Sequence, residues 1–229
     1  MKKHDSPIYR TILDLPLIKG ASSARLTEIA GKYKLHFLKF QPGQTIVTAG
    51  TPCDELKFVL TGVVRLTITD PDGLLTVSQT LTAPQVIAPD HLFGRLTQYP
   101  ATVQAVETTG IMEISKEEYR RMLSSDTVFL FNYLNSVCTT SQRGPRWLTA
   151  LTSGSPIQRI AYWISSLTQQ GSTDIEIRAE KTDLHTVFGI PAPAWRSATN
   201  HLSSAGLIKD VTPHSFHVPS RAPLAALLN

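Results

Sequence analysis

The feature that most constrains the fold of this chain is the stretch Lys181–Ile208, KTDLHTVFGIPAPAWRSATNHLSSAGLI. Its apolar spacing predicts two short helices joined by a tight turn, with Leu184 and Phe188 facing inward on the first helix. Gly189 supplies the left-handed conformation that such a turn needs. Pro193 suits the start of the second helix, because a proline lacks an amide hydrogen that would have no partner in the first turn.

The second helix is expected to run to about Ser204, and Gly206 is expected to end it. Leu207 and Ile208 are then expected to start a strand, and Lys209–Val218 holds two short extended runs around a proline. The side chains at the inward spacing of the second helix are Trp195, Ala198 and Leu202. Two helices followed by a two-stranded wing are typical of a module that presents a helix to the major groove of DNA. On spacing alone, an ordinary pair of helices packed on a core remains the alternative.

Composition and length limit the class of protein. The chain has 229 residues, 41% hydrophobic and 17% charged, which predicts a globular protein of one large or two modest domains. We expect it in the cytoplasm and not in a membrane, because no apolar run reaches the length of a membrane helix and no signal-type core follows the N-terminus. Cys53 and Cys138 lie far apart without metal-ligand spacing, so neither a metal nor another cofactor is predicted.

The charge balance fits a phosphate-bearing partner only weakly. The formal net charge is +4. From Ser155 onward, however, six lysine and arginine residues face five aspartate and glutamate residues, a small excess for a DNA-binding domain. Four of the seven histidines lie in the same region and would add charge below about pH 6.5.

Residues 8–34 show the spacing of short amphipathic helices, and the pattern changes to extended runs from Leu35 to Ile114. These runs are separated by turn signals at intervals typical of a small antiparallel barrel or sandwich. Asp72-Gly73 is the strongest hairpin signal in the chain. Ser115 is placed to cap a following helix, with two glutamates in its first turn.

A longer helical stretch starts near Val128. One outer stripe recurs at three-to-four spacing: Phe131, Leu134, Cys138 and Ser141. Such a stripe either pairs with its twin in a second subunit or packs on the barrel, and the spacing leaves both open. Gly144-Pro145 is expected to kink or interrupt this helix. Another amphipathic helix follows Pro156 and leads into a strand at Asp174–Arg178.

The order of these elements divides the chain into residues 1–115, 116–153 and 154–229, and it resembles the Crp/Fnr family of transcription regulators. The sequences that carry the resemblance are FQPGQTIVTAG at Phe40–Gly50, LKFVLTGVVRL at Leu56–Leu66, and Arg159-Ile160-Ala161. The resemblance implies an α+β protein with an N-terminal antiparallel, jelly-roll-like β-roll of the cyclic-nucleotide-binding type. A long central dimerisation helix and a C-terminal winged helix-turn-helix would follow.

The resemblance also implies partners. Two copies would join along the central helix and set two recognition helices one turn of double-stranded DNA apart, roughly 34 Å. They would contact a near-palindromic site. A small-molecule effector, whose identity the sequence does not give, would bind in the β-roll. RNA polymerase is expected as a further partner.

The roll departs from the pattern of nucleotide-binding members. Where those members carry a Gly-Glu pair for the ribose and an Arg-Ser/Thr pair for the cyclic phosphate, this chain has Ala88-Pro89 and Tyr99-Pro100. Burying a cyclic phosphate without the cation and backbone donors would cost several kcal/mol, so no response to cyclic AMP is predicted. Two interpretations remain, a pocket for an apolar or aromatic effector and a filled core. The positions concerned are Ile87, Ala88, Pro89, Leu92, Phe93, Tyr99 and Pro100.

The second helix departs as well. Family members carry an Arg-Glu pair and a later arginine that bond base edges, and this chain has Ala192, Pro193 and Ser197 at those positions. Arg196, one residue away, is the best candidate for a base or phosphate contact. Thr182 is a candidate both for a phosphate contact and for the cap of the first helix. The full set of candidate DNA contacts is Lys181, Thr182, Ala192, Arg196, Ser197, Asn200, His201 and Lys209.

These patterns favour a homodimeric DNA-binding regulator. The alternative is a ligand-sensing or protein-interaction module that keeps the fold and has lost sequence-specific DNA recognition. A metal enzyme of the cupin type is not expected, because His36 and His91 have no further ligands clustered with them. The sequence also lacks a nucleophile elbow and a nucleotide-binding loop, so no enzymatic activity is predicted.

Overall fold

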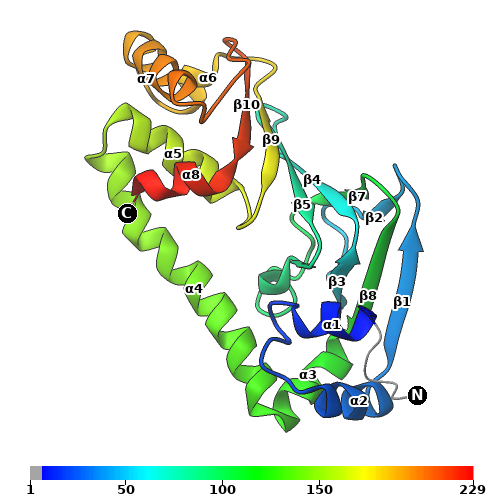
Figure 1. Ribbon diagram of the computed structural model, residues 1–229. Coiled ribbons are helices and arrows are strands. Elements are labelled where there is room, and N and C mark those ends of the chain that lie inside the picture. The colour runs from blue at the N-terminus through cyan, green and yellow to red at the C-terminus, as the bar shows by residue number, and fades with distance from the viewer. Residues whose placement is uncertain (1–6, 229) are drawn as a thin grey trace. The chain divides into compact units, whose positions relative to one another are not determined.

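The computed structural model describes the backbone of residues 7–228 and the side chains of residues 10–142, 150–151 and 153–228. It is a mixed α+β structure with antiparallel strands (Figure 1). The chain forms two compact units. The roll unit contains the described residues up to Val64 together with Thr82–Thr140, and the C-terminal unit contains Arg65–Leu81 and the described residues from Ser141 onward. Arg65–Leu81, which lies within the expected segment 1–115, is part of the C-terminal unit.

The roll unit begins with two helices and continues as antiparallel strands. Four of its strands form a sheet in the order β1-β8-β3-β6, and β2 pairs with β7. The register places Leu56 opposite Ile114 and Phe58 opposite Met112, so the apolar alternation of the sequence forms buried rows. The elements are α1 (Pro7–Leu13), α2 (Ser23–Lys32), β1 (Leu35–Phe40), β2 (Thr45–Val47), β3 (Glu55–Thr61), β6 (Gln85–Ile87), the 3-10 turn η2 (Pro89–His91), β7 (Thr102–Ala105) and β8 (Thr109–Ser115).

Two helices follow the roll, α3 (Lys116–Ser125) and α4 (Thr127–Thr152). The Ser115 side chain accepts a hydrogen bond from the amide of Glu118, which confirms the predicted N-cap. The 26-residue α4 runs through Gly144-Pro145 without a break, so of the two expected outcomes, a kink or an interruption, the interruption does not occur. A proline removes one helical hydrogen bond, and a helix of this length keeps many others. Within residues 7–228, no helix has both the length and the apolar character needed to cross a membrane.

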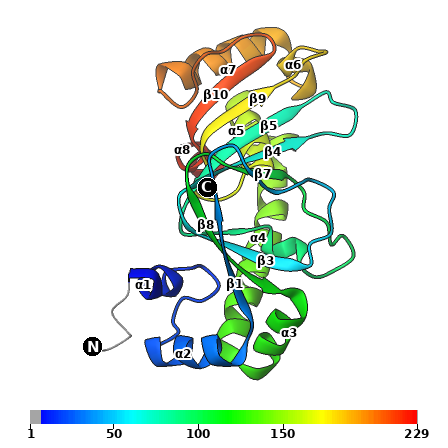
Figure 2. The ribbon, with the colours of Figure 1, turned by 90° about the vertical axis from the view of Figure 1, so that its right-hand side faces the viewer.

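The C-terminal unit is built on a sheet in the order β10-β9-β5-β4, with helices packed against it (Figure 2). Its strands β9 and β10 pair antiparallel, with Phe216 opposite Ile177. Its elements are most of β4 (Val63–Thr69) and β5 (Thr76–Thr82), then α5 (Pro156–Leu167), β9 (Thr173–Arg178), α6 (Leu184–Val187), α7 (Ala192–Ser204), β10 (Ser215–Ser220), α8 (Arg221–Ala225) and the 3-10 turn η3 (Ala226–Leu228).

An aromatic cluster fills the core of the C-terminal unit. The ring of Phe188 lies 5.3 Å from Trp195, 5.7 Å from Trp163 and 6.1 Å from Phe216, measured between centroids. Val77, from the β4–β5 hairpin, belongs to the same buried cluster. The inward spacing of α7 is confirmed, because its three inner side chains are buried: Trp195, Ala198 and Leu202.

The expected strand at Leu207-Ile208 is wrong. The amide of Leu207 donates to the carbonyl of Leu202 at 2.9 Å, which closes the end of α7 and occupies the backbone that a strand would use. The segment between α7 and β10 pairs with β10 through one isolated bridge, between Lys209 and His217. The two backbone hydrogen bonds of this bridge are 2.8 and 2.9 Å long. The wing is therefore β10 joined to a single paired residue.

Candidate functional site

The junction of α6 and α7 is a tight turn. Gly189 has a φ of 61°, the left-handed conformation predicted from the sequence. The guanidinium of Arg159, on α5, donates to the carbonyl of Gly189 at 2.9 Å. A neighbouring helix therefore fixes the turn that sets the direction of α7. Arg159 was noticed in the sequence only as part of a family motif, which did not indicate this role.

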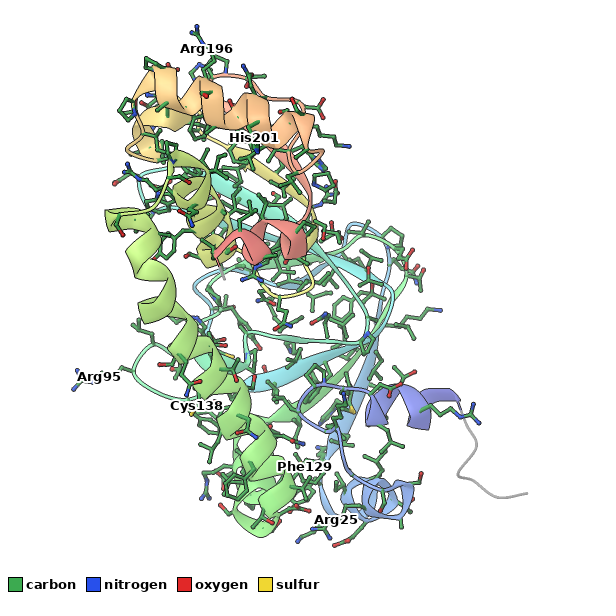
Figure 3. The ribbon with its side chains drawn as sticks, turned by 60° about the vertical axis from the view of Figure 1, so that its left-hand side comes forward. Arg25, Arg95, Phe129, Cys138, Arg196 and His201 are labelled. Atoms are coloured by element: carbon green, nitrogen blue, oxygen red, sulfur yellow. The ribbon has the colours of Figure 1, made fainter. Side chains whose placement is uncertain are left out.

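Helix α7 has one buried and one exposed face. Pro193 lies in its first turn, within one residue of the expected start. Figure 3 shows Arg196 pointing outward, away from the rest of the C-terminal unit. The predicted contact residues of this helix are all exposed: Ala192, Arg196, Ser197, Asn200 and His201. These exposed candidates include one cation, one amide, one imidazole and one hydroxyl.

The remaining candidate DNA contacts lie beside α6 and in the wing. Lys181 is exposed, but its ammonium group donates to the carbonyl of Asp72 in the β4–β5 turn at 3.2 Å. Thr182 does not cap α6, because Asp183 occupies the N-cap position. The carbonyl of Thr182 instead contacts the ring of His214 at 3.2 Å. Lys209 is exposed and lies at the bridge of the wing.

The predicted effector positions lie in one segment of the roll, residues 87–100, here called the cassette. Ala88 is 2% exposed and has a φ of 44°, so the backbone keeps a glycine-like conformation without a glycine. Tyr99 is 3% exposed, and its hydroxyl donates to the carbonyl of Glu55 at 2.6 Å. Burial raises the pKa of Tyr99 above its usual range. The phenol is therefore neutral, and this position carries no cation for a phosphate.

Aromatic side chains close the cassette from α4. The hydroxyl of Tyr133 donates to the carbonyl of Pro89 at 3.0 Å, and its ring meets Phe93 edge-to-face at 5.6 Å. Ile87 and Leu92 are buried, Pro89 and Phe93 are half-buried, and Pro100 is exposed. This packing is what a filled core requires. Tyr133 was not predicted as part of the site, although it lies in the helical stretch predicted from near Val128.

Helix α4 also has two faces. Phe129 is fully buried and Tyr133 is 9% exposed on the side packed within the roll unit. Figure 3 labels Phe129 and Cys138 on this helix. The predicted stripe lies on the other side and is exposed throughout: Phe131, Leu134, Cys138 and Ser141. Phe131 is 59% exposed and Leu134 is 42% exposed, so the stripe is not core packing within this chain.

Sequence comparisons place a known domain over the roll. Residues 37–126 match the family described as the cyclic nucleotide-binding domain. The potassium channel SKOR of Arabidopsis thaliana is 32% identical over 114 residues, which are 48% of this chain and 13% of the channel. The cAMP-activated global transcriptional regulator CRP of Haemophilus influenzae is 26% identical over 135 residues, 59% of this chain and 60% of that protein. The chain thus spans a small part of the channel and somewhat over half of the regulator.

Structural comparisons extend the likeness over most of the chain. The catabolite activator protein of Thermus thermophilus matches with a TM-score of 0.53 at 19% identity, over 93% of this chain and all of that one. The c-di-GMP responsive global regulator CLP of Xanthomonas campestris matches with a TM-score of 0.50 at 14% identity, over 86% of this chain and 99% of that one. At these identities the likeness concerns the fold.

Residues 37–126 thus match the cyclic nucleotide-binding domain, in a chain whose fold resembles that of the catabolite activator protein. With a CRP relative and regulators as structural neighbours, the predicted resemblance to the Crp/Fnr family is confirmed. These relatives are regulators and an ion channel, not enzymes.

Proposed function

We propose that this protein is a homodimeric, sequence-specific DNA-binding transcription regulator that does not respond to cyclic AMP. The observation that carries the proposal is the exposed outer face of α7, centred on Arg196, on a turn fixed by Gly189 and Arg159. Helix α6, the turn, α7 and the short wing have the order of a winged helix-turn-helix. On this proposal the protein acts on DNA in the cytoplasm, with RNA polymerase as a further partner.

DNA contact would use the side chains that α7 leaves in solvent. An arginine can bond the N7 and O6 of guanine with two hydrogen bonds, and an asparagine can bond adenine in the same way. Arg196 and Asn200 are exposed one helical turn apart. Ser197, His201 and Lys209 would contact the phosphate backbone, which positions the helix without specifying sequence.

The test of DNA binding is selection of binding sites from random DNA, followed by gel shift of the selected sequence. We expect a near-palindromic site whose affinity falls steeply with salt, because several phosphates are neutralised. Weak binding that is insensitive to sequence and salt would favour the alternative module that has lost DNA recognition. The small positive excess of the C-terminal region and the engagement of Lys181 by Asp72 are the features that favour this alternative.

The homodimer is proposed from the apolar stripe of α4. Two copies of this helix packed side by side would cover Phe131 and Leu134, large apolar side chains that the described monomer leaves exposed. Leu134→Glu should convert the dimer into a monomer at micromolar concentration, with little loss of monomer stability, because this position is solvent-exposed within one chain. Sedimentation measures the mass, and Thr139→Glu, an exposed polar position beside the stripe, is the control.

Native Cys138 gives an independent test of the same seam. It is an exposed thiol on the stripe, whereas Cys53 is buried. A short bifunctional thiol reagent should therefore link two chains through Cys138, and Cys138→Ser should abolish the link. A wild-type protein that sediments as a monomer and forms no linked pair would refute the homodimer.

The absence of a cyclic AMP response is proposed from the cassette. Pro89 has no amide hydrogen to donate, and the Tyr99 hydroxyl is already bonded to Glu55. Tyr99 would offer a buried cyclic phosphate no cation, and Pro89 would offer it no amide hydrogen. Titration calorimetry with cyclic AMP should show no heat of binding at millimolar ligand, and the midpoint of thermal unfolding should not shift.

A further inference from the structure

The β4–β5 hairpin, Arg65–Leu81, is part of the C-terminal unit although the chain enters it from Val64 and leaves it toward Thr82 in the roll unit. Strand β5 pairs antiparallel with β9, with Val77 opposite Ile177 and Ser78 opposite Glu176. Figure 2 shows β4 and β5 continuing the sheet that β10 and β9 begin. A hairpin from the first half of the chain is thus an integral part of the sheet on which α6 and α7 pack.

Gln79 pins this hairpin to the turn between α5 and β9. Its side chain is fully buried. The side-chain carbonyl accepts the amide of Gln169 at 2.7 Å and the hydroxyl of Ser172, and its amide group donates to the carbonyl of Leu167 at 3.4 Å. Removing the side chain would leave buried donors without a partner, so these contacts strongly favour the docked position.

Asp174 forms a second attachment point. Its carboxylate accepts hydrogen bonds from Arg65 on β4 at 2.9 Å and from Thr80 on β5 at 3.4 Å. The ring of His217 on β10 contacts the other carboxylate oxygen at 2.8 Å. Asp174 has a φ of 47°, a conformation that a non-glycine residue adopts only when its surroundings hold it there. The carboxylate of Asp174, on β9, therefore connects the hairpin to both β9 and β10.

The hairpin also reaches the core and the start of α6. Val77 is 1% exposed and belongs to the buried cluster that contains Trp195. At the tip, the carbonyl of Asp72 accepts a hydrogen bond from Lys181, three residues before α6. The hairpin therefore touches the packing beneath α7 and the chain that leads into the helix pair.

We propose that the β4–β5 hairpin is a positioning element for α7. The docked hairpin holds α6 and α7 in the arrangement that binds DNA. The proposal rests on the proposed DNA-binding function. It assigns to Gln79, Arg65 and Asp174 a role in DNA affinity, although none of them lies on the outer face of α7.

The first experiment weakens docking in the full-length protein. Gln79→Ala, Arg65→Ala and the double variant are compared by hydrogen exchange of the β5 and β9 amides and by affinity for the selected operator. Exchange should rise along the series, and DNA affinity should fall in parallel, by about tenfold for Gln79→Ala. Arg95→Ala, an exposed arginine of the roll unit, is the matched control and should change neither quantity.

The second experiment restores docking. Ser78→Cys with Glu176→Cys, in a Cys138→Ser background, places two thiols at opposed positions of β5 and β9. The oxidised crosslink should preserve operator affinity and should return most of the affinity lost in Gln79→Ala, while reduction should remove the rescue. This readout separates positioning from a general loss of folding, because the crosslink acts only on the hairpin.

Four outcomes overturn the proposal. The first three are loss of DNA binding when the hairpin is crosslinked, unchanged affinity in variants whose β5 amides exchange freely, and lost affinity in variants whose β5 amides remain protected. If the amides stay protected and affinity stays unchanged in all three variants, the contacts named here do not hold the hairpin, and the proposal is equally wrong. Failure of wild-type protein to select any DNA site refutes the proposed function instead, and the exchange measurements still show whether the hairpin is held.

Discussion

The cassette of the roll and the outer face of α7 both differ from the sequence pattern of the Crp/Fnr family. The changed side chains have different surroundings in the two regions. In the cassette, Tyr99 and Tyr133 form hydrogen bonds to backbone carbonyls, and Ala88 and Tyr99 are buried. On α7, Arg196 and its neighbours have simply been left in solvent.

The difference follows from burial. A buried site that has lost its charged ligand must satisfy its polar groups within the protein, since an unpaired buried group costs about 1–3 kcal/mol. A surface helix has water as a partner, so its outer side chains can change without any repacking. The side chains of the cassette and those on the outer face of α7 can therefore change independently. The proposed lack of a cyclic AMP response is thus compatible with the proposed DNA binding.

The largest effect is expected from the inner face of α7. Trp195→Ala should lower the free energy of unfolding of the C-terminal unit by about 3–5 kcal/mol, because it removes a ring packed against Phe188 and Phe216. Denaturant unfolding followed by tryptophan fluorescence and circular dichroism measures it. Ser203→Ala, on the exposed side of the same helix, is the control and should stay within about 0.5 kcal/mol of wild type. Equal stability of both variants would mean that α7 does not pack as described.

The next effect concerns the outer face alone. Arg196→Ala should weaken operator binding by about 1–3 kcal/mol and leave the unfolding free energy almost unchanged. Fluorescence anisotropy at two salt concentrations gives the affinity and its salt slope. A loss confined to one base pair indicates a base contact, whereas a uniform loss with a lower salt slope indicates a phosphate contact. An affinity equal to that of Arg95→Ala would remove Arg196 from the interface.

A smaller effect is expected in the cassette. Tyr99→Phe removes a buried hydroxyl and leaves the carbonyl of Glu55 without that donor, which should cost about 1 kcal/mol of stability. Tyr133→Phe removes the corresponding bond to Pro89, a half-buried residue, and should cost less. Neither variant should gain affinity for cyclic AMP. A tight cyclic AMP complex of Tyr99→Phe would show that the phenol alone had closed the site, and the role assigned to Pro89 would be wrong.

Local patterns predicted the parts of this molecule that depend on neighbouring residues. The apolar spacing of α7, the turn at Gly189, the N-cap at Ser115 and the hairpin at Asp72-Gly73 were all predicted, because each depends on residues within a few positions of one another. The order of elements then indicated the family. The overall α+β fold followed from these local signals together with the resemblance.

Contacts between distant segments were not predicted. Gln79 and Ser172, or Arg65 and Asp174, are about a hundred positions apart in the chain, and no periodicity links them. The closing of α7 by Leu207 was missed for a related reason, since the segment is as apolar as a strand, but a local hydrogen bond engages its backbone first. The sequence thus predicted the two faces of α7 but not the hairpin that supports it.

The smallest expected effect is a pH dependence at Asp174. The hydrogen bond from His217, helped by Arg65 and Thr80, holds the pKa of this carboxyl below its usual range despite some desolvation. The folded state therefore favours the carboxylate. Its contribution to stability is complete above the unfolded pKa, about 3.9, and is lost as the pH falls through the lower folded pKa. Because the side chain is 54% exposed, solvent screening keeps this contribution small.

Asp174→Asn isolates that contribution. Unfolding free energies measured between pH 6 and pH 3 should fall less steeply for Asp174→Asn than for wild type, because the variant no longer has a carboxylate to protonate. Asp72→Asn, in the turn of the β4–β5 hairpin, controls for loss of another carboxylate and should keep the wild-type slope. Parallel curves for wild type and Asp174→Asn would show that the carboxylate gains nothing from its contacts on folding. The ionised carboxylate of Asp174 would then not contribute to the stability of the docked hairpin.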